Sequence, residues 1–476
     1  MEARRPHIFV TLFLLAILTA AGPAPARAEE RHKLSSLIAM ARQGYPGVDA
    51  ARRAVEAMEA KVFQARWAWV PQGKVTGLLA PAPQIECEDD IVVNGQTIVC
   101  PGTKQVIRND SLDSISIKGV YGRIELELGM PIYTFDKLGA AKRAAAAGLE
   151  ARQAQVAVAQ NKVATDVAKA YWGLKLAREI LFTVKEGKGH LDTAIAKVEK
   201  ELDEGTGDVT ETDRLRLKTA AAEVEARLHE ARKGEEMART TLALLTGAKS
   251  LAGFDVDGEV LEPLEGEPAD PGSYLALALS KRPEVKALKA AGLARQAAVD
   301  LEKSRFYPDL LLVARAGYGA ATSVDNPEHG FFNNPFNFLS AGFGLAMRWK
   351  WDQLQQYGKL RGARAEAGET EAKRREALMG IALEVRKAVL DLTEAHKRLV
   401  TTKAGAKAAR SWLVATVQNL EAGLSSPRDL VDALVAYFTM NLRYLQAMYE
   451  VNSGWYELAR VTGATLKGLP RAKPGA

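Results

Sequence analysis

The 476-residue chain contains a long internal repeat. Pro46-Gly47-Val48 begins a stretch that reaches Pro71 after 25 residues, and Pro283-Glu284-Val285 begins a stretch that reaches Pro308 after the same interval. Later landmarks follow in the same order, while the offset between the copies falls from 237 to 216 residues. A unit of about 220 residues is much longer than a solenoid repeat. The sequence therefore predicts two related structural halves, separated by small insertions and deletions.

Each half has the same order of expected elements: a helix, two strands, a very long helix and a return helix. The expected helices cover residues 34–66, 136–204, 210–245, 274–305, 355–422 and 428–461. The expected strands cover about 72–80, 113–131, 309–320 and 338–351. At 1.5 Å per residue the long helices would extend roughly 100 Å. The fold class is therefore expected to be mainly α, with a duplicated helix–strand–strand–long helix–return helix unit.

These elements suggest a division of the chain. Residues 29–247 form the first repeat, 248–272 an acidic linker rich in Gly and Pro, 273–466 the second repeat, and 467–476 a disordered basic tail. Residues 1–28 have the features of a secretory signal, with Arg4 and Arg5 before an apolar stretch and Ala26-Arg27-Ala28 as the cleavage site. An uncleaved anchor is the alternative. No cysteine directly follows the cleavage site, which argues against a lipid anchor.

The two cysteines, Cys87 and Cys100, are close together in a chain expected to be exported, which favours one disulfide. A loop of that size is worth about 3 kcal/mol in the chain-entropy picture. A zinc site is a weaker alternative, because no histidine lies between them. The other histidines are scattered, so we expect no metal site and no cofactor. No nucleophile or phosphate-binding motif is present, so no enzyme is expected.

The formal charge of +6 is small and both signs are interspersed, which gives no reason to expect nucleic acid binding. After the signal, no stretch reaches the 18 apolar residues of a membrane helix.

One strand has the pattern of a membrane strand. From Leu339 to Trp351 apolar side chains alternate with small or polar ones, over more than the 9–11 residues that a membrane strand needs. Trp349 and Trp351 would lie in an interfacial girdle. In the first half the apolar face changes sides near Gly119, so a bulge, or an exit of the chain from the membrane, is expected there. A sheet packed against its own helices is the alternative interpretation.

Four strands cannot close a barrel in lipid, where open sheet edges are not tolerated. If these strands enter a membrane, several chains must share one barrel. Two copies would supply eight strands and three would supply twelve. The strand pattern therefore predicts an oligomer without fixing its size.

The chain resembles the TolC-like outer-membrane efflux proteins over nearly all of its expected mature length. The resemblance rests on the repeat, on the strand pair before each long helix, and on the segment Ala422 to Ala433. In that segment a glycine is followed six and nine residues later by aspartates and then by alanine, a pattern matched by Gly423, Asp429, Asp432 and Ala433. The first-half counterpart is weaker, with Glu211 or Asp213 at the acidic place.

The resemblance implies a homotrimer with a twelve-stranded membrane β-barrel in the outer membrane of a Gram-negative bacterium and a periplasmic α-helical tunnel. It implies a passive duct of a tripartite efflux or type I secretion system. The partners would be a periplasmic adaptor (membrane fusion) protein, an inner-membrane transporter and outer-membrane lipid. A soluble periplasmic coiled-coil adaptor or scaffold is the alternative, which the strand from Leu339 to Trp351 disfavours.

The resemblance assigns Asp429 and Asp432 to the pore constriction. Being i and i+3, they share a helix face, and three copies would form a ring that attracts cations and raises the pKa of these carboxyls. Stabilisation of the helix N-terminus is the structural alternative for Asp429. The tip turns, expected to contact the adaptor, contain Gly205, Thr206, Gly423, Leu424 and Ser425. The family often has a basic residue where Ser425 stands, so the closed entrance is expected to be held differently.

Overall fold

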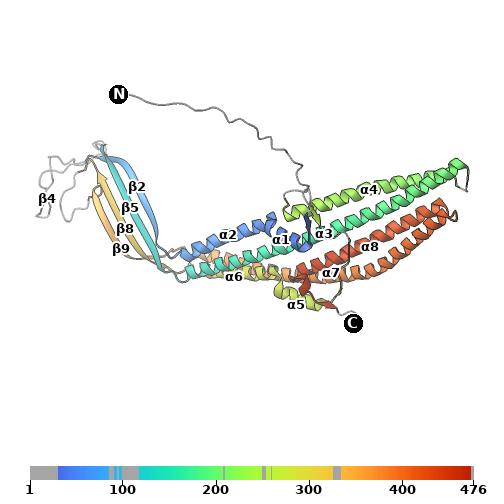
Figure 1. Ribbon diagram of the computed structural model, residues 1–476. Helices are drawn as coiled ribbons and strands as arrows, with labels where there is room; N and C mark the ends of the chain where they lie inside the picture. The colour runs from blue at the N-terminus through green and yellow to red at the C-terminus, as the bar shows by residue number, and fades with distance from the viewer. Residues whose placement is uncertain are drawn as a thin grey trace, which may run out of the picture. The chain divides into compact units, whose positions relative to one another are not determined.

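The computed structural model describes residues 30–84, 91–93, 96–98, 117–206, 209–248, 254–258, 260–324 and 334–472 (Figure 1). The signal at 1–28 and the predicted Cys87–Cys100 disulfide lie outside these residues. Within the described part, no helix is both long and apolar enough to span a membrane.

The described residues contain eight α-helices and one four-stranded sheet, in the expected order along the chain. The helices are α1 (Leu34–Gly44), α2 (Pro46–Trp67), α3 (Lys137–Glu204), α4 (Glu211–Thr246), α5 (Pro271–Lys281), α6 (Pro283–Ser304), α7 (Gln353–Glu421) and α8 (Pro427–Thr462). The sheet strands are β2 (Gln72–Pro83), β5 (Ile117–Tyr133), β8 (Asp309–Ala321) and β9 (Phe338–Arg348). The mainly helical duplicated unit expected from the sequence is confirmed.

Two helices that the sequence predicted to be continuous are each broken by a proline. The first ends before Pro46, with Tyr45 at φ −70° and ψ 127°. The second ends before Pro283, with Arg282 at φ −65° and ψ 125°. The ring of a proline disfavours the helical conformation of the preceding residue. The same two prolines that mark the repeat therefore divide each of these helices into two.

The chain forms two compact units. One contains Pro46–Lys162, Gly266–Thr393 and Glu457–Ala476, and it includes the sheet. The strands of this sheet are antiparallel throughout, in the order β2-β5-β8-β9 (Figure 1). Among the described strands, β2 and β9 are therefore the edges of the sheet.

The expected bulge in the first half is confirmed. Ala82 pairs with Gly119 but the next residue, Pro83, pairs with Ile117, so β5 has one extra residue at this point. An extra residue shifts the alternation of side chains by one position, which explains why the apolar face of β5 changes sides.

The last strand is shorter than expected. β9 ends at Arg348, opposite Asp309, the first residue of β8. Pro308 precedes Asp309 and has no N–H for a further ladder bond. The Trp349 indole N–H instead donates to the Phe306 carbonyl at 3.1 Å, so the chain leaves the sheet before Trp351.

The C-terminal segment is more ordered than predicted. Residues Leu466–Gly468 form a 3₁₀ helix, and β10 (Arg471–Ala472) pairs with β7 (Glu267–Pro268). The Tyr274 hydroxyl, on a fully buried side chain, donates to the Pro470 carbonyl and accepts from the Ala269 N–H at 3.1 Å. The expected disordered tail is therefore wrong for residues 467–472, because this anchoring holds them.

The other unit contains Met1–Tyr45, Val163–Glu265 and Glu394–Tyr456. In it, parts of α3 and α7 each pair with a return helix, α4 and α8 respectively (Figure 1). All four helices contribute to a single apolar core. Its largest buried members are Leu181, Leu191, Val198, Leu217, Leu228, Leu413, Leu420, Leu430, Leu434 and Tyr437.

The segment between the repeats is held on this unit by side-chain hydrogen bonds. The fully buried Asn452 amide accepts from the Leu264 N–H at 2.6 Å and donates to the Glu262 carbonyl at 2.8 Å. The Lys175 ammonium donates to the Val260 carbonyl at 3.2 Å, and burial lowers the pKa of Lys175. A short parallel ladder between β1 (Glu30–His32) and β6 (Phe254–Val256) adds to this attachment.

Candidate functional site

The second helix turn begins where α7 ends. Gly423 has φ 75°, the left-handed conformation that glycine adopts without steric cost. The Leu424 N–H donates to the Asn419 carbonyl at 2.7 Å and the Gly423 N–H to the Leu420 carbonyl at 3.1 Å. This arrangement is a Schellman-type helix end, in which carbonyls left over by the helix are satisfied. The glycine is therefore needed for the turn itself.

Asp429 closes the start of α8. Its carboxylate accepts from the Ser426 N–H at 2.9 Å, while the Ser426 hydroxyl accepts from the Asp429 N–H at 3.3 Å, which is a capping box. The same carboxylate accepts from the Ser426 and Ser425 hydroxyls. The hydrogen bonds from Ser426 hold the pKa of Asp429 below its usual range. Within a single chain Asp429 therefore stabilises the start of α8, as the structural alternative proposed, while the raised pKa expected of a ring of several chains stays a prediction.

Asp432 is engaged differently. Its side chain is 61% exposed, and its partner within the described chain is the Arg428 guanidinium one turn earlier, at 3.9 Å. A surface ion pair at that distance contributes little. Asp432 is therefore the carboxylate of the pair that remains available to a ligand.

The first helix turn has the same backbone design. Gly205 has φ 63°, and the Thr206 N–H donates to the Glu201 carbonyl at 2.9 Å. Thr210 and Asp213 form the capping box of α4, with N–H to oxygen distances of 3.1 and 3.2 Å. Of the two acids that the sequence offered, Asp213 is thus the equivalent of Asp429.

The two turns differ in their exposed side chains. Asp213 pairs with Arg216 at 3.3 Å, and Arg216 has the position in the first repeat that Asp432 has in the second. Leu424, 80% exposed, follows the second turn glycine, while the polar Thr206 follows the first. Among the described residues of the two turns, the exposed leucine after the glycine is found on the second turn, and the third residue after the capping aspartate is acidic there and basic on the first turn.

The sequence did not reveal that the two helical hairpins are tied together near the turns. The Lys197 ammonium on α3 donates to the last carbonyls of α7, those of Leu420 and Glu421. A positively charged side chain is attracted to the free carbonyls at the C-terminus of a helix. The only signal for this contact was a lysine near the end of a long helix, which is a common feature.

A second tie lies further along the hairpins. The Tyr437 hydroxyl on α8 donates to the Glu186 carboxylate on α3 at 2.7 Å, and Arg410 on α7 lies 3.6 Å from the other oxygen of Glu186. Burial and then the bond to Glu186 raise the pKa of Tyr437. Four residues on, the Asn441 amide donates to the Thr183 hydroxyl at 2.8 Å.

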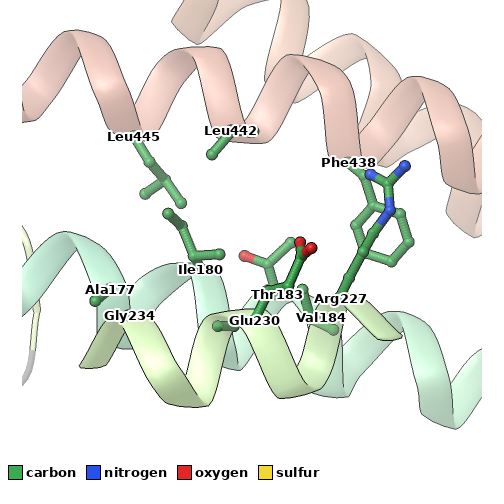
Figure 2. A pocket seen from close by; sticks show the side chains of 11 residues that line it. Ala177, Ile180, Thr183, Val184, Arg227, Glu230, Gly234, Phe438, Leu442 and Leu445 are labelled. Atoms are coloured by element: carbon green, nitrogen blue, oxygen red, sulfur yellow. The ribbon is translucent and has the colours of Figure 1, made fainter. Parts of the chain in front are cut away.

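Beside these ties lies an apolar cavity of about 310 Å³ (Figure 2). Phe438, Leu442 and Leu445 of α8 extend from one side toward α3 and α4 (Figure 2). Ile180 lies opposite on α3. A neighbouring hollow of about 690 Å³ shares Phe438 and Arg227 and continues along the groove between α4 and α8.

The sheet has two chemically different faces. Its apolar face is exposed, with Leu339 84%, Phe343 86% and Leu345 81% exposed on β9. Trp349 and Trp351 lie just beyond the strand, in edge-to-face contact with ring centres 4.8 Å apart. The predicted alternation is present, but the two tryptophans are on the connection to α7 rather than in the strand.

The polar face contains an aromatic cluster that the sequence did not predict. Phe336, in the turn before β9, contacts Tyr121 edge to face at 5.4 Å, and the Arg123 guanidinium lies 5.8 Å from the Phe338 ring centre. Phe338 fits over Gly319, where a Cβ atom would lie 2.5 Å from the ring. Glycine opposite phenylalanine in paired strands was the signal that could have found it.

No group of three or more potential metal ligands of the His, Cys, Asp or Glu type occurs in the described part of the chain. The features that the structure does bring together are two capped turns, an apolar groove and a two-faced sheet.

Comparisons with known proteins identify the family of the chain. The family model described as outer membrane efflux protein matches residues 110–248 and 274–464. The cobalt-zinc-cadmium resistance protein CzcC of Cupriavidus metallidurans is 24% identical over 392 residues, covering 82% of this chain and 87% of that protein. The alkaline protease secretion protein AprF of Pseudomonas aeruginosa is 23% identical, covering 71% of this chain and 69% of that protein.

The fold is also found in solved structures. The Campylobacter jejuni CmeC outer membrane channel superposes with a TM-score of 0.74 at 15% identity, covering 90% of this chain and 85% of that one. With the family model matched in both repeats, the chain belongs to the outer membrane efflux protein family.

Proposed function

We propose that the chain is the outer-membrane duct of a tripartite efflux or type I secretion system, working as a homotrimer and catalysing no reaction. The observation that carries this proposal is the sheet. It exposes a band of large apolar side chains on one face and charged side chains on the other, and its edge strands β2 and β9 have no outer partner among the described strands. In lipid such edges must be paired, and other copies of the chain can pair them.

The helices supply a second argument for self-association. α7 exposes Met379, Leu383 and Val400 at 69%, 71% and 72% of their surface. Large apolar groups on one helix favour burial against another surface, at about 25 cal/mol per Å². In the proposed trimer, twelve strands form one barrel and the long helices of neighbouring chains cover each other.

The tip turns are proposed as the periplasmic entrance. Asp432, exposed and weakly paired, would line the constriction, with Asp429 beside it as the cap of α8. Gly205, Thr206, Gly423, Leu424 and Ser425 would meet the periplasmic adaptor, with Leu424 as the apolar contact. The groove between α4 and α8 offers the adaptor further apolar surface.

The two relatives are named for metal resistance and for protease secretion. We infer that this chain is likewise an export duct. Its cargo is then chosen by the inner-membrane transporter that delivers it. The alternative, a soluble periplasmic scaffold, needs no exposed apolar sheet face.

The test is the mass of the mature protein extracted from membranes. We expect the protein in the outer-membrane fraction, requiring detergent, with the mass of three chains plus bound detergent. A protein that stays in solution without detergent as a monomer or dimer would contradict the duct and favour the scaffold.

A further inference from the structure

The register of the sheet places three charged side chains in one row across the strands. Lys74 on β2 is directly opposite Glu127 on β5, which is directly opposite Arg315 on β8, which is opposite Gly342 on β9. Residues that are directly opposite in paired strands point to the same face. The row therefore lies on the polar face of the sheet.

The row contains more positive than negative charge. The Arg315 guanidinium lies 3.4 Å from the Glu127 carboxylate, and both side chains are largely exposed. Lys74 is exposed and makes no ion pair or hydrogen bond to the residues that the structure describes. Each chain thus adds one uncompensated positive charge at this level of the sheet.

The neighbouring row on the same face is balanced. Glu125 lies opposite Thr76 and Gly317, and its carboxylate pairs with Arg123 on its own strand. Beside Arg315 there is free space, because Gly342 has no side chain and a Cβ atom there would meet nothing within 4 Å. The charged row is therefore both unbalanced and open to a ligand.

We propose that Lys74, Glu127 and Arg315 form a ring of fixed charge inside the channel that concentrates anions and binds small polyvalent anions of the phosphate class. The inference rests on the proposed function, since a ring requires several chains around one lumen. Lys74 and Arg315 would contact the anion, while Glu127 holds the Arg315 guanidinium and limits the net charge. Charged side chains on the lumen face of barrels set ion selectivity.

This ring has the opposite sign to the acidic constriction proposed at Asp432. An ion crossing the duct would pass both in series, so the measured selectivity contains a contribution from each. Substitutions in one ring at a time separate the two contributions. One unit charge about 10 Å away in water changes the local concentration of a monovalent ion about twofold. Salt screens this effect, and the screening length rises from about 10 Å at 0.1 M to about 30 Å at 0.01 M.

The test is planar-bilayer recording at low ionic strength with a salt gradient, using detergent-purified protein whose oligomeric mass has been checked. The double variant Lys74→Gln with Arg315→Gln removes two cations per chain, so the anion-to-cation permeability ratio should fall about twofold or more. Glu127→Gln removes the anion, so the ratio should rise. Thr76→Ser, in the neighbouring row, changes no charge and should leave the ratio unchanged.

Binding is measured with tripolyphosphate added to the side away from the helices. It should reduce the wild-type current, and the double variant should require at least about tenfold more for the same reduction. Glu127→Gln, a near-isosteric change, keeps the test valid if the double variant does not assemble. If the double variant and Glu127→Gln both kept the permeability ratio and the tripolyphosphate sensitivity of the wild type, this inference alone would be overturned. Absence of channels in the wild type would overturn the proposed function together with it.

Discussion

The two helix turns share a backbone and differ in surface chemistry. Each has a glycine with positive φ, an N–H that reaches back five residues, and a capping box that starts the return helix. After the capping box, the first turn carries Arg216 and the second carries Asp432. The local interactions that make a tight helical turn are thus present in both repeats, while the third residue after the capping aspartate is basic in the first repeat and acidic in the second. The comparison assigns the proposed acidic ring to the second repeat.

The largest expected effect comes from reversing that difference. Asp432→Arg makes the second turn resemble the first and should abolish block of the channel by a trivalent cation. One carboxylate about 6 Å from a trivalent cation in water is worth about 2 kcal/mol, so its loss alone exceeds a tenfold change. Single-channel recording measures the block. Arg216→Ala is the matched control, and a block that follows Arg216 instead of Asp432 would contradict the assignment.

Because Asp429 caps α8, we expect it to contribute less than Asp432 to the block by a trivalent cation. The double variant Asp429→Ala with Asp432→Ala should raise conductance and remove the block, but Asp432→Ala should account for most of the change. Equal contributions from the two single variants would show that Asp429 faces the ligand as much as Asp432 does.

The ties between the hairpins give the next largest effect. Tyr437→Phe removes the hydrogen bond to Glu186 and should lower stability by about 1–3 kcal/mol, because the bond joins a buried hydroxyl to a charged group. Tyr444→Phe on the same helix is the control. Tyr444 makes no hydrogen bond to the described residues, so a change within about 0.5 kcal/mol is expected. Equal losses of stability in the two variants would show that the Tyr437–Glu186 hydrogen bond does not stabilise the protein.

The Tyr437 tie also has a pH dependence with a defined sign. Because the pKa of Tyr437 is raised in the folded protein, its contribution is fully present below the unfolded pKa of about 10 and is lost as pH rises through the folded value. Thermal unfolding in detergent should therefore show a steeper alkaline loss in the wild type than in Tyr437→Phe. Parallel curves above pH 10 would contradict this linkage.

The turn glycines should behave alike in the two repeats. Gly205→Ala and Gly423→Ala should each cost about 1–2 kcal/mol, because a side chain disfavours the left-handed conformation. At both positions a Cβ atom would meet nothing within 4 Å, so the cost comes from the backbone alone. Hydrogen exchange of the last turns of α3 and α7 would measure it. A clear difference between the repeats would break the claim that the turns share a backbone.

The smallest expected effects concern the caps. Thr210→Ala and Ser426→Ala should each cost about 1 kcal/mol. Ser426→Ala should also raise the pKa of Asp429, since the Ser426 hydroxyl makes the largest contribution to lowering it. Carboxyl NMR of selectively labelled protein reports that pKa. An unchanged value would mean that the hydroxyl does not hold the carboxylate.

The sequence predicted the elements well where one local pattern decides them. Alternation over residues 339–348 and uninterrupted helical spacing on either side of Gly423 correspond to β9, α7 and α8. The predicted element boundaries were wrong where a single proline decides them. Pro46 and Pro283 were used as landmarks, but their effect on the preceding residue was missed, and Pro308 ends the ladder that the pattern extended to Trp351.

Contacts between distant segments were beyond the sequence. Lys197 of α3 contacts the end of α7, Asn452 of α8 binds the segment between the repeats, and Phe338 lies over Gly319 of the neighbouring strand. Their residue types are common, and their spacing has no period. The acidic motif in the second repeat was visible, but the separate roles of Asp429 and Asp432 required the hydrogen bonds of Ser426.

The central claim is that this chain forms a channel through a membrane in which the second turn supplies the acidic constriction. Planar-bilayer recording of the purified mature protein tests it most directly. We predict channels of small conductance with net cation selectivity, blocked by a trivalent cation from the side of the helices, with the block lost in Asp432→Arg. A purified protein that never conducts, or channels that a trivalent cation leaves unaffected, would contradict it.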